Sequence, residues 1–277
     1  MSEYLLSTSG LTKQFGHHKA VNNVDLHVKK GAIYGFIGRN GAGKTTFLKM
    51  ISGLSKPTDG EIQMFGYRNE ELKNVRSRIS CLIEAPGIYG NMSAYHNLAI
   101  KCRLFGINDS KYIENILKIV GLSEVGKKKT KHFSLGMKQR LGIGLALVGE
   151  PDLLVLDEPI NGLDPQGIAE IRDMLLRLKE EQNMTIIISS HILEELSKIA
   201  THYGIIHNGS LIQELTREEL MTRCSERMEL TLDDPKAALP ILDQMGFTNY
   251  QVVNQSTIHI YERLNESAAV NMELAKA

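Results

Sequence analysis

Apolar residues follow two patterns along this chain, and the patterns predict two kinds of strand. Four apolar runs show no alternation with polar residues, which is typical of strands that are covered on both faces of a sheet. They lie at residues 33–37, 79–83, 153–156 and 185–189. Shorter runs at 4–8, 21–28 and 61–65 are separated by Gly, Asn, Pro and Asp. We therefore expect a parallel core with crossover helices, flanked by an antiparallel layer.

Helical periodicity replaces the strand pattern between about residues 85 and 150, which predicts a helical insertion there. Its apolar positions recur at the spacing of a helix in 97–104, 112–120 and 136–148. After about residue 222 the chain restarts with short strand and helix segments of its own. We expect a large α/β domain over residues 1–222 and a small α+β appendage over 223–277.

Composition and charge exclude several classes of protein. The formal net charge is zero, so no overall positive field attracts nucleic acid. The three cysteines, Cys81, Cys102 and Cys224, are widely separated, which suits a reducing compartment. No apolar run approaches the roughly 20 residues that cross a bilayer, and the first residues do not resemble a signal peptide. We expect a soluble, cytoplasmic protein that reaches a membrane only through a partner.

The segment from Gly38 to Thr45 carries the strongest chemical signal. It fits G-x-x-x-x-G-K-[ST] and directly follows the apolar run at 33–37, as a phosphate-binding loop between a strand and a helix would. Glycines let successive N–H groups face one concavity, and the next helix adds its positive end. A glycine-rich turn that fits by chance is the alternative. The candidate nucleotide-binding residues here are Gly38, Arg39, Asn40, Gly41, Ala42, Gly43, Lys44, Thr45 and Thr46.

The residues of this loop, and the two carboxylates that follow the run at 153–156, are suited to different steps of triphosphate chemistry. Lys44 can reach the β- and γ-phosphates of a triphosphate, and the Thr45 hydroxyl can ligate Mg²⁺. Ligands of such sheets bind at the carboxyl ends of strands, so Asp157 is a second candidate for Mg²⁺. Because adjacent side chains of a strand point in opposite directions, Glu158 should point away from Asp157 and is a candidate general base for the attacking water. The alternative is an acidic strand end that only caps a helix.

Three further motifs occur in a fixed order around these carboxylates. Phe-Ser-Leu-Gly-Met-Lys-Gln-Arg at 133–140 precedes them, Asn-Gly-Leu-Asp-Pro at 161–165 follows, and His191 comes after the run at 185–190. With the phosphate loop, these motifs resemble the ATP-binding cassette (ABC) ATPases over residues 1–220. The resemblance implies an α/β fold: a P-loop NTPase core with an antiparallel β subdomain and the helical insertion.

The resemblance also implies roles that the residues alone do not establish. Phe15 would stack on adenine, and His191 would be the switch histidine that acts with Lys44 and Glu158 in catalysis. Ser134 and Gly136 would lie in the signature loop and Asp164 in the D-loop, all three facing nucleotide. Taken singly, Phe15 also suits a core position, Ser134 a helix N-cap and His191 a strand-to-helix cap.

Two departures from the common cassette pattern indicate a subgroup. The usual signature is Leu-Ser-Gly-Gly-Gln, whereas this chain has Leu135 in place of the first glycine and Met137 in place of the glutamine. After the run at 79–83, most cassettes have a glutamine where this chain has Glu84. This combination resembles bacitracin-efflux and lantibiotic-immunity ATPases. A carboxylate at position 84 keeps an oxygen for the metal, so Glu84 is a further candidate for Mg²⁺ and nucleotide.

The resemblance therefore implies an ATPase that uses ATP and Mg²⁺ and forms a homodimer around ATP. It also implies a polytopic membrane permease as partner, a place on the inner face of the bacterial membrane, and export of a peptide antibiotic. The alternative is a non-transport cassette that acts on ribosomes or nucleic acid. A single cassette, zero net charge and no long coiled-coil insertion disfavour it, so we expect no nucleic-acid partner. A binding module without turnover is opposed by Lys44, Asp157, Glu158 and His191.

Overall fold

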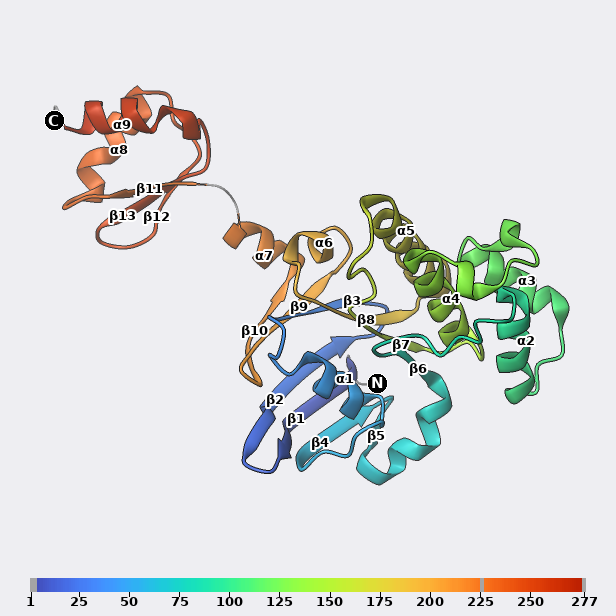
Figure 1. The fold of residues 1–277 in the computed structure, drawn as a ribbon. Helices are drawn as coiled ribbons and strands as arrows, with labels where there is room; N and C mark the ends of the chain where they lie inside the picture. Colours follow the sequence, from blue (N-terminus) through green and yellow to red (C-terminus); the bar gives the residue numbers. More distant parts are fainter. Residues whose placement is uncertain (1–3, 225–226, 276–277) are drawn as a thin grey trace. The chain divides into compact units, whose positions relative to one another are not determined.

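The computed structural model describes residues 4–224 and 227–275 of the 277, which divide into two compact units (Figure 1). The first unit covers residues 1–217 and the second 218–277. The boundary lies a few residues before the predicted 222, at the start of helix α7 (Arg217–Cys224).

A six-stranded sheet forms the centre of the first unit, in the order β10-β9-β3-β8-β7-β6. β3 pairs with β8 and β9, and β7 pairs with β6 and β8, all in parallel, while β9 and β10 are antiparallel. The strands are β3 (Ile33–Ile37), β6 (Ile79–Leu82), β7 (Leu153–Asp157), β8 (Thr185–Ser190), β9 (His202–His207) and β10 (Ser210–Thr216). Every residue of β7 and β8 is buried, as their unbroken apolar pattern predicts. The pattern did not predict β9 and β10, which interleave His, Gly, Ser and Gln with apolar residues.

An antiparallel sheet in the order β2-β1-β4-β5 flanks this centre. Its strands are β1 (Tyr4–Phe15), β2 (His18–Lys29), β4 (Asp59–Met64) and β5 (Tyr67–Arg68). Helix α1 (Lys44–Ile51) lies between the two sheets (Figure 1), and one hydrophobic core joins all three, with Val24 of β2, Phe47 of α1 and Val155 of β7 in it. The phosphate loop is therefore fixed at both of its ends by buried structure.

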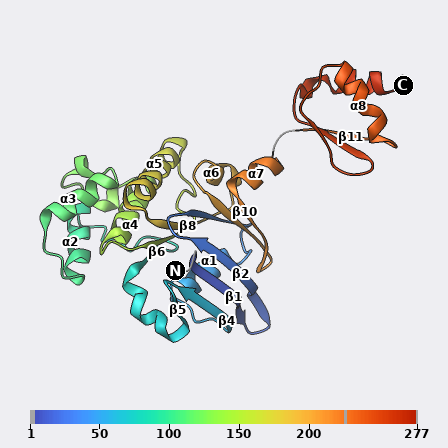
Figure 2. The same ribbon diagram turned by 180° about the vertical axis from the view of Figure 1, so that it is seen from behind.

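The insertion between β6 and β7 is helical, and the views in Figures 1 and 2 agree that its helices lie together beyond β6. It contains α2 (Ala94–Leu104), α3 (Ser110–Ile119) and α4 (Leu135–Leu147). Ser93, Asp109 and Ser134 accept a backbone N–H at the first turn of these helices, which explains where each one begins. Helices α5 (Pro165–Gln182) and α6 (Leu193–Ser197) follow β7 and β8. Single 3₁₀ segments lie at Asn69–Arg78, Ser123–Val125 and Thr130–His132.

The second unit has a three-stranded antiparallel sheet in the order β11-β13-β12 and a core of its own. Leu242, Phe247, Ile258, Ile260 and Val270 are at most 1% exposed there. Its elements are β11 (Met228–Thr231), α8 (Pro235–Gln244), β12 (Tyr250–Val252), β13 (Thr257–Ile260), a 3₁₀ turn (Leu264–Glu266) and α9 (Ser267–Leu274).

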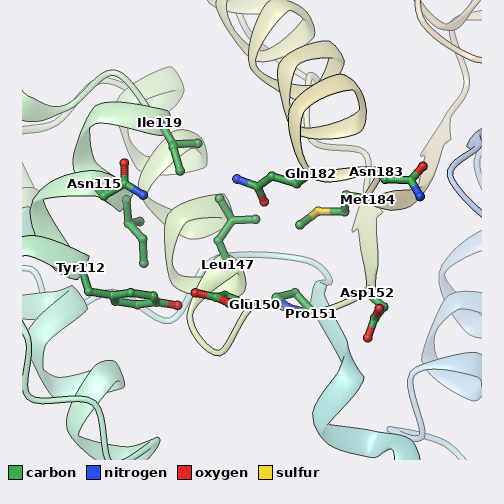
Figure 3. Close-up of a pocket in the computed structure, with 11 residues that line it drawn as sticks. Tyr112, Asn115, Ile119, Leu147, Glu150, Pro151, Asp152, Gln182, Asn183 and Met184 are labelled. Atoms are coloured by element: carbon green, nitrogen blue, oxygen red, sulfur yellow. The ribbon is translucent and has the colours of Figure 1, made fainter.

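A cavity of about 360 Å³ lies between the helical insertion and the end of α5 (Figure 3). Tyr112 of α3, Leu147 of α4 and Gln182 of α5 line it, together with Asp152 and Met184. Asp152 and Met184 directly precede β7 and β8, so the cavity lies where these strands begin. Ligands of parallel sheets bind where strands end, and this cavity is therefore separate from the predicted nucleotide site.

Among residues 4–224 and 227–275, no helix is both long enough and apolar enough to cross a membrane.

Tyr34 is a buried polar side chain that ties three strands together. It is 1% exposed, and its hydroxyl donates to Glu214 Oε1 of β10 at 2.7 Å. The backbone N–H of His27 in β2 donates to the same oxygen at 2.9 Å. Burial raises the pKa of Tyr34, and the Glu214 carboxylate raises it further, so the hydroxyl stays a proton donor. A Cβ on Gly204 of β9 would lie 2.4 Å from the Tyr34 hydroxyl oxygen, which requires glycine there.

We expect Gly204→Ala to lower the free energy of unfolding by roughly 1–3 kcal/mol because of this overlap. Tyr34→Phe removes the hydroxyl oxygen, so the double variant should be less destabilised than the sum of the two single variants. Urea unfolding of the three variants measures this coupling. Additive effects would contradict the contact.

Candidate functional site

The backbone of the phosphate loop is shaped by glycines that no larger residue can replace without strain. A Cβ on Gly38 would lie 2.6 Å from the carbonyl oxygen of Ile206 in β9, and one on Gly43 would lie 2.3 Å from that of Ala20 in β2. Gly41 and Gly43 also have positive φ angles, 81° and 105°, which only glycine adopts readily. The loop is thereby pressed between β2 and β9 at the start of α1.

Lys44 is folded back into this loop and is 5% exposed. Its ammonium donates to the carbonyl oxygens of Gly38 at 2.6 Å and Arg39 at 3.3 Å. It also forms an ion pair with Glu158 Oε1 at 3.1 Å. A buried ammonium needs such partners, and the oxygens of a phosphate offer the same chemistry.

Asp157 ends β7 and connects the loop to β8. Thr45 Oγ1 donates to Asp157 Oδ2 at 2.7 Å, and Ser189 Oγ donates to Asp157 Oδ1 at 2.6 Å. The Ser189 hydroxyl in turn accepts the N–H of Glu158 at 3.0 Å. Sequence reasoning missed Ser189; the only signal was a polar residue at the end of the apolar run before His191.

Glu158 connects Lys44 to His191. Its Oε1 faces Lys44, while His191 Nδ1 lies 2.9 Å from its Oε2. Its φ is 48°, a costly backbone conformation for a residue other than glycine, and such strain is concentrated at functional sites. Lys44, Glu158 and His191, from three different segments of the chain, thus meet in one series of polar contacts.

The oxygens of Thr45 and Asp157 fit Mg²⁺, which prefers oxygen ligands. The Thr45 hydroxyl oxygen and Asp157 Oδ2 are hydrogen-bonded to each other. Within the described parts of the chain, no group of three or more His, Cys, Asp and Glu side chains could hold a metal. Mg²⁺ usually binds one or two protein groups and takes its other ligands from substrate phosphates and water.

Phe15 and Glu84, two residues assigned by resemblance, lie outside this cluster of contacts. Phe15 ends β1 with its side chain 55% exposed, and Lys13 Nζ lies 5.1 Å from the centre of its ring. The Glu84 carboxylate is 67% exposed and accepts a hydrogen bond from Lys49 Nζ of α1 at 2.6 Å. Sequence reasoning did not identify Lys49 as the partner of Glu84.

Ser134, Gly136 and Asp164 form a second cluster, at the starts of α4 and α5. Ser134 Oγ accepts the N–H of Met137 at 3.3 Å, and Asp164 Oδ1 accepts that of Gly167 at 3.1 Å. The three residues line a hollow of about 480 Å³ that contains no residue of the phosphate loop. One chain therefore presents two separate groups of predicted nucleotide-binding residues.

Comparison with known proteins decides the family. A sequence profile described as "ABC transporter" matches residues 21–161. The bacitracin transport ATP-binding protein BcrA of Bacillus licheniformis is 44% identical over 271 residues, which cover 96% of this chain and 88% of that protein. This chain belongs to the ABC transporter family. The lantibiotic transport ATP-binding protein SrtF of Streptococcus pyogenes is 43% identical to this cassette over 76% of the cassette and 90% of SrtF.

Solved structures confirm the fold class of this cassette. The structure of cbiO1 from Clostridium perfringens, part of the ABC transporter complex cbiONQ, matches with a TM-score of 0.72 and 26% identity. It covers 80% of this chain and 92% of that one. A nucleotide-free ATP-binding cassette from an ABC transporter matches with a TM-score of 0.71 and 27% identity, covering 80% and 96%. The cassette is an ATPase, as the sequence predicted, and ATP is its substrate.

Removing the Ser189 hydroxyl tests the link between Asp157 and Glu158. Ser189→Ala should lower the free energy of unfolding by about 1.5–3 kcal/mol, since it removes a hydrogen bond to a buried carboxylate. Urea unfolding measures the change. Ser197→Ala in α6, whose hydroxyl bonds only a backbone carbonyl near the surface, is the control and should change stability by less than about 0.5 kcal/mol. Equal effects would contradict a special role for Ser189.

Proposed function

We propose that this cassette is the ATP-hydrolysing subunit of a bacterial exporter that expels a peptide antibiotic of the bacitracin or lantibiotic type. The identity of 44% with BcrA across 96% of the chain carries the proposal. The similarity to SrtF supports it independently. Export requires a polytopic permease as partner, which would place the cassette on the inner face of the cell membrane.

The contacts of Lys44 and Glu158 suggest how the cassette handles ATP. A triphosphate in the loop offers its oxygens to the Lys44 ammonium in place of the Gly38 and Arg39 carbonyls. This exchange frees Glu158 Oε1 to accept a proton from the attacking water, while His191 holds Oε2 and orients the carboxylate. Thr45 and Asp157 would hold Mg²⁺, which would supply positive charge to neutralise the phosphates.

The separation of the two clusters within one chain supports a head-to-tail homodimer. The starts of α4 and α5 offer backbone N–H groups and positive helix ends, which suit the phosphates of ATP. In a symmetric dimer, Ser134, Gly136 and Asp164 of each copy would face the ATP in the phosphate loop of the other. Two ATP molecules would then hold the two copies together, and ATP hydrolysis would let the copies separate.

An apolar groove on the helical insertion supports the permease contact. It measures about 310 Å³, runs between β6, α2 and α4, and includes Tyr89, Ile100 and Leu104. Tyr89 is 58% and Leu104 79% exposed, so the groove presents apolar side chains that a partner could cover. Glu84 follows β6, between Leu82 and Pro86, which both line this groove. There it can connect α1 with the insertion through Lys49.

The function is tested in cells that depend on this cassette and its permease for survival in bacitracin or a lantibiotic. Lys44→Ala should weaken ATP binding by roughly 10- to 150-fold, because a charge-assisted contact is worth about 1.5–3 kcal/mol, and resistance should vanish. Calorimetry and growth measure the two effects. Affinity purification should recover a membrane protein; recovery of ribosomes or nucleic acid instead would contradict the transport function.

A second test concerns Glu84. Glu84→Gln keeps the size and one oxygen but loses the charge that binds Lys49, so the permease contact tuned to the carboxylate should suffer. We expect protection in cells to fall more than the ATPase rate of the isolated subunit. Lys49→Met removes the same ion pair from the other side and should reproduce the loss of protection. A collapse of ATPase activity with Glu84→Gln alone would instead make Glu84 a metal ligand.

A further inference from the structure

Helices α4 and α5 are neighbours in both Figure 1 and Figure 2. A Cβ placed on Gly136, in the first turn of α4, would lie only 4.0 Å from the Cα of Gly167 in the first turn of α5. In the same hollow, a Cβ on Gly162 would lie 3.4 Å from Leu135 Cδ2. The signature loop and the D-loop are therefore in close contact within one chain.

The Glu170 carboxylate connects the two helices, a few residues after these loops in the sequence. Arg140, in the second turn of α4, donates from Nη1 to Glu170 Oε2 of α5. The other oxygen of Glu170 accepts from Gln166 Nε2, one turn earlier in α5, at 3.1 Å. The Arg140 side chain is only 16% exposed. Both oxygens of Glu170 are thus engaged, one by each helix.

The pair is poorly explained by stability alone. Arg140 Nε is buried and has no hydrogen-bond partner, so the guanidinium is not fully satisfied. Partly buried ion pairs cost desolvation and often stabilise a fold no better than apolar residues would. What the hydrogen bond from Arg140 Nη1 to Glu170 adds is a direct connection between the first two turns of α4 and of α5.

We propose that Arg140, Glu170 and Gln166 are positioning residues that hold the signature loop and the D-loop together as one unit. None of them needs to contact ATP. They fix the distance between Ser134 and Asp164, so that both reach the ATP bound by a second copy at the same time. This inference rests on the head-to-tail dimer proposed above.

The test uses Glu158→Gln protein, which should bind ATP without hydrolysing it and accumulate as a dimer. In that background, Arg140→Ala and Glu170→Gln should raise the dimer dissociation constant with ATP roughly tenfold or more, because a small misplacement of binding groups is costly. Sedimentation measures it. ATP affinity of the monomer, measured at low protein concentration, should change less than about twofold, since the phosphate loop is untouched.

Two further variants separate positioning from general stability. Arg140→Lys keeps the charge but replaces the planar guanidinium with an ammonium of different shape and reach, and dimerisation should be rescued only in part. Arg177→Ala removes an arginine from the exposed face of α5, where its Nε bonds only a backbone carbonyl, and dimerisation should stay at the parent level.

The outcomes are distinct. Variants that dimerise like the Glu158→Gln parent would overturn the positioning role while leaving the dimer intact. A loss of monomer ATP affinity as large as the loss of dimerisation would overturn it in favour of a role in folding. A Glu158→Gln parent that stays monomeric with ATP would contradict the proposed dimer itself, and this inference with it.

Discussion

The nucleotide site depends on the need of the buried Lys44 ammonium for negative partners. At 5% exposure, this cation would be expensive without them. The loop carbonyls of Gly38 and Arg39 and the carboxylate of Glu158 provide them. The glycine-dependent path of the loop places the carbonyls, and the order β3-β8-β7 in the sheet places Glu158. Any substrate that displaces these partners must bring its own negative oxygens, as a triphosphate does.

A single chain contains two half-sites of different character. The phosphate loop and the end of β7 bring together the Lys44 ammonium, the paired oxygens of Thr45 and Asp157, and the Glu158 carboxylate. The starts of α4 and α5 offer capped helix ends with Ser134 and Asp164. Because the two groups lie apart in one chain, ATP would connect the copies in the proposed dimer. The proposed role of the Arg140–Glu170 pair is to hold the second half-site in shape. The Lys49–Glu84 pair connects α1 to the segment that enters the helical insertion.

The second unit contains none of the predicted nucleotide-binding residues. Its core of residues such as Phe247 and Ile258 is complete by itself, as expected for an independently folded module. The alignment with BcrA extends over 96% of the chain, so it includes most of this unit. The module is therefore shared with a bacitracin transport relative and is not an addition peculiar to this chain.

The sequence by itself determined the elements whose signals are local. Unbroken apolar runs gave the buried strands, and G-x-x-x-x-G-K-[ST] gave the phosphate loop, because the spacing of glycines and of apolar residues acts within a few positions. The order of the motifs was enough to identify the family. The apolar pattern did not predict β9 and β10, because their mixed composition carries no local strand signal and β9 is defined by its pairing with β3.

Tertiary structure decided which side chains pair. Ser189 meets Asp157 across 32 residues, Lys49 meets Glu84 across 35, and Arg140 meets Glu170 across 30. Each pair joins two different strands or helices, or a helix and a loop, whose neighbourhood follows from the order of strands in the sheet and from helix packing. No local pattern encodes that order, because it results from burying all the apolar faces at once.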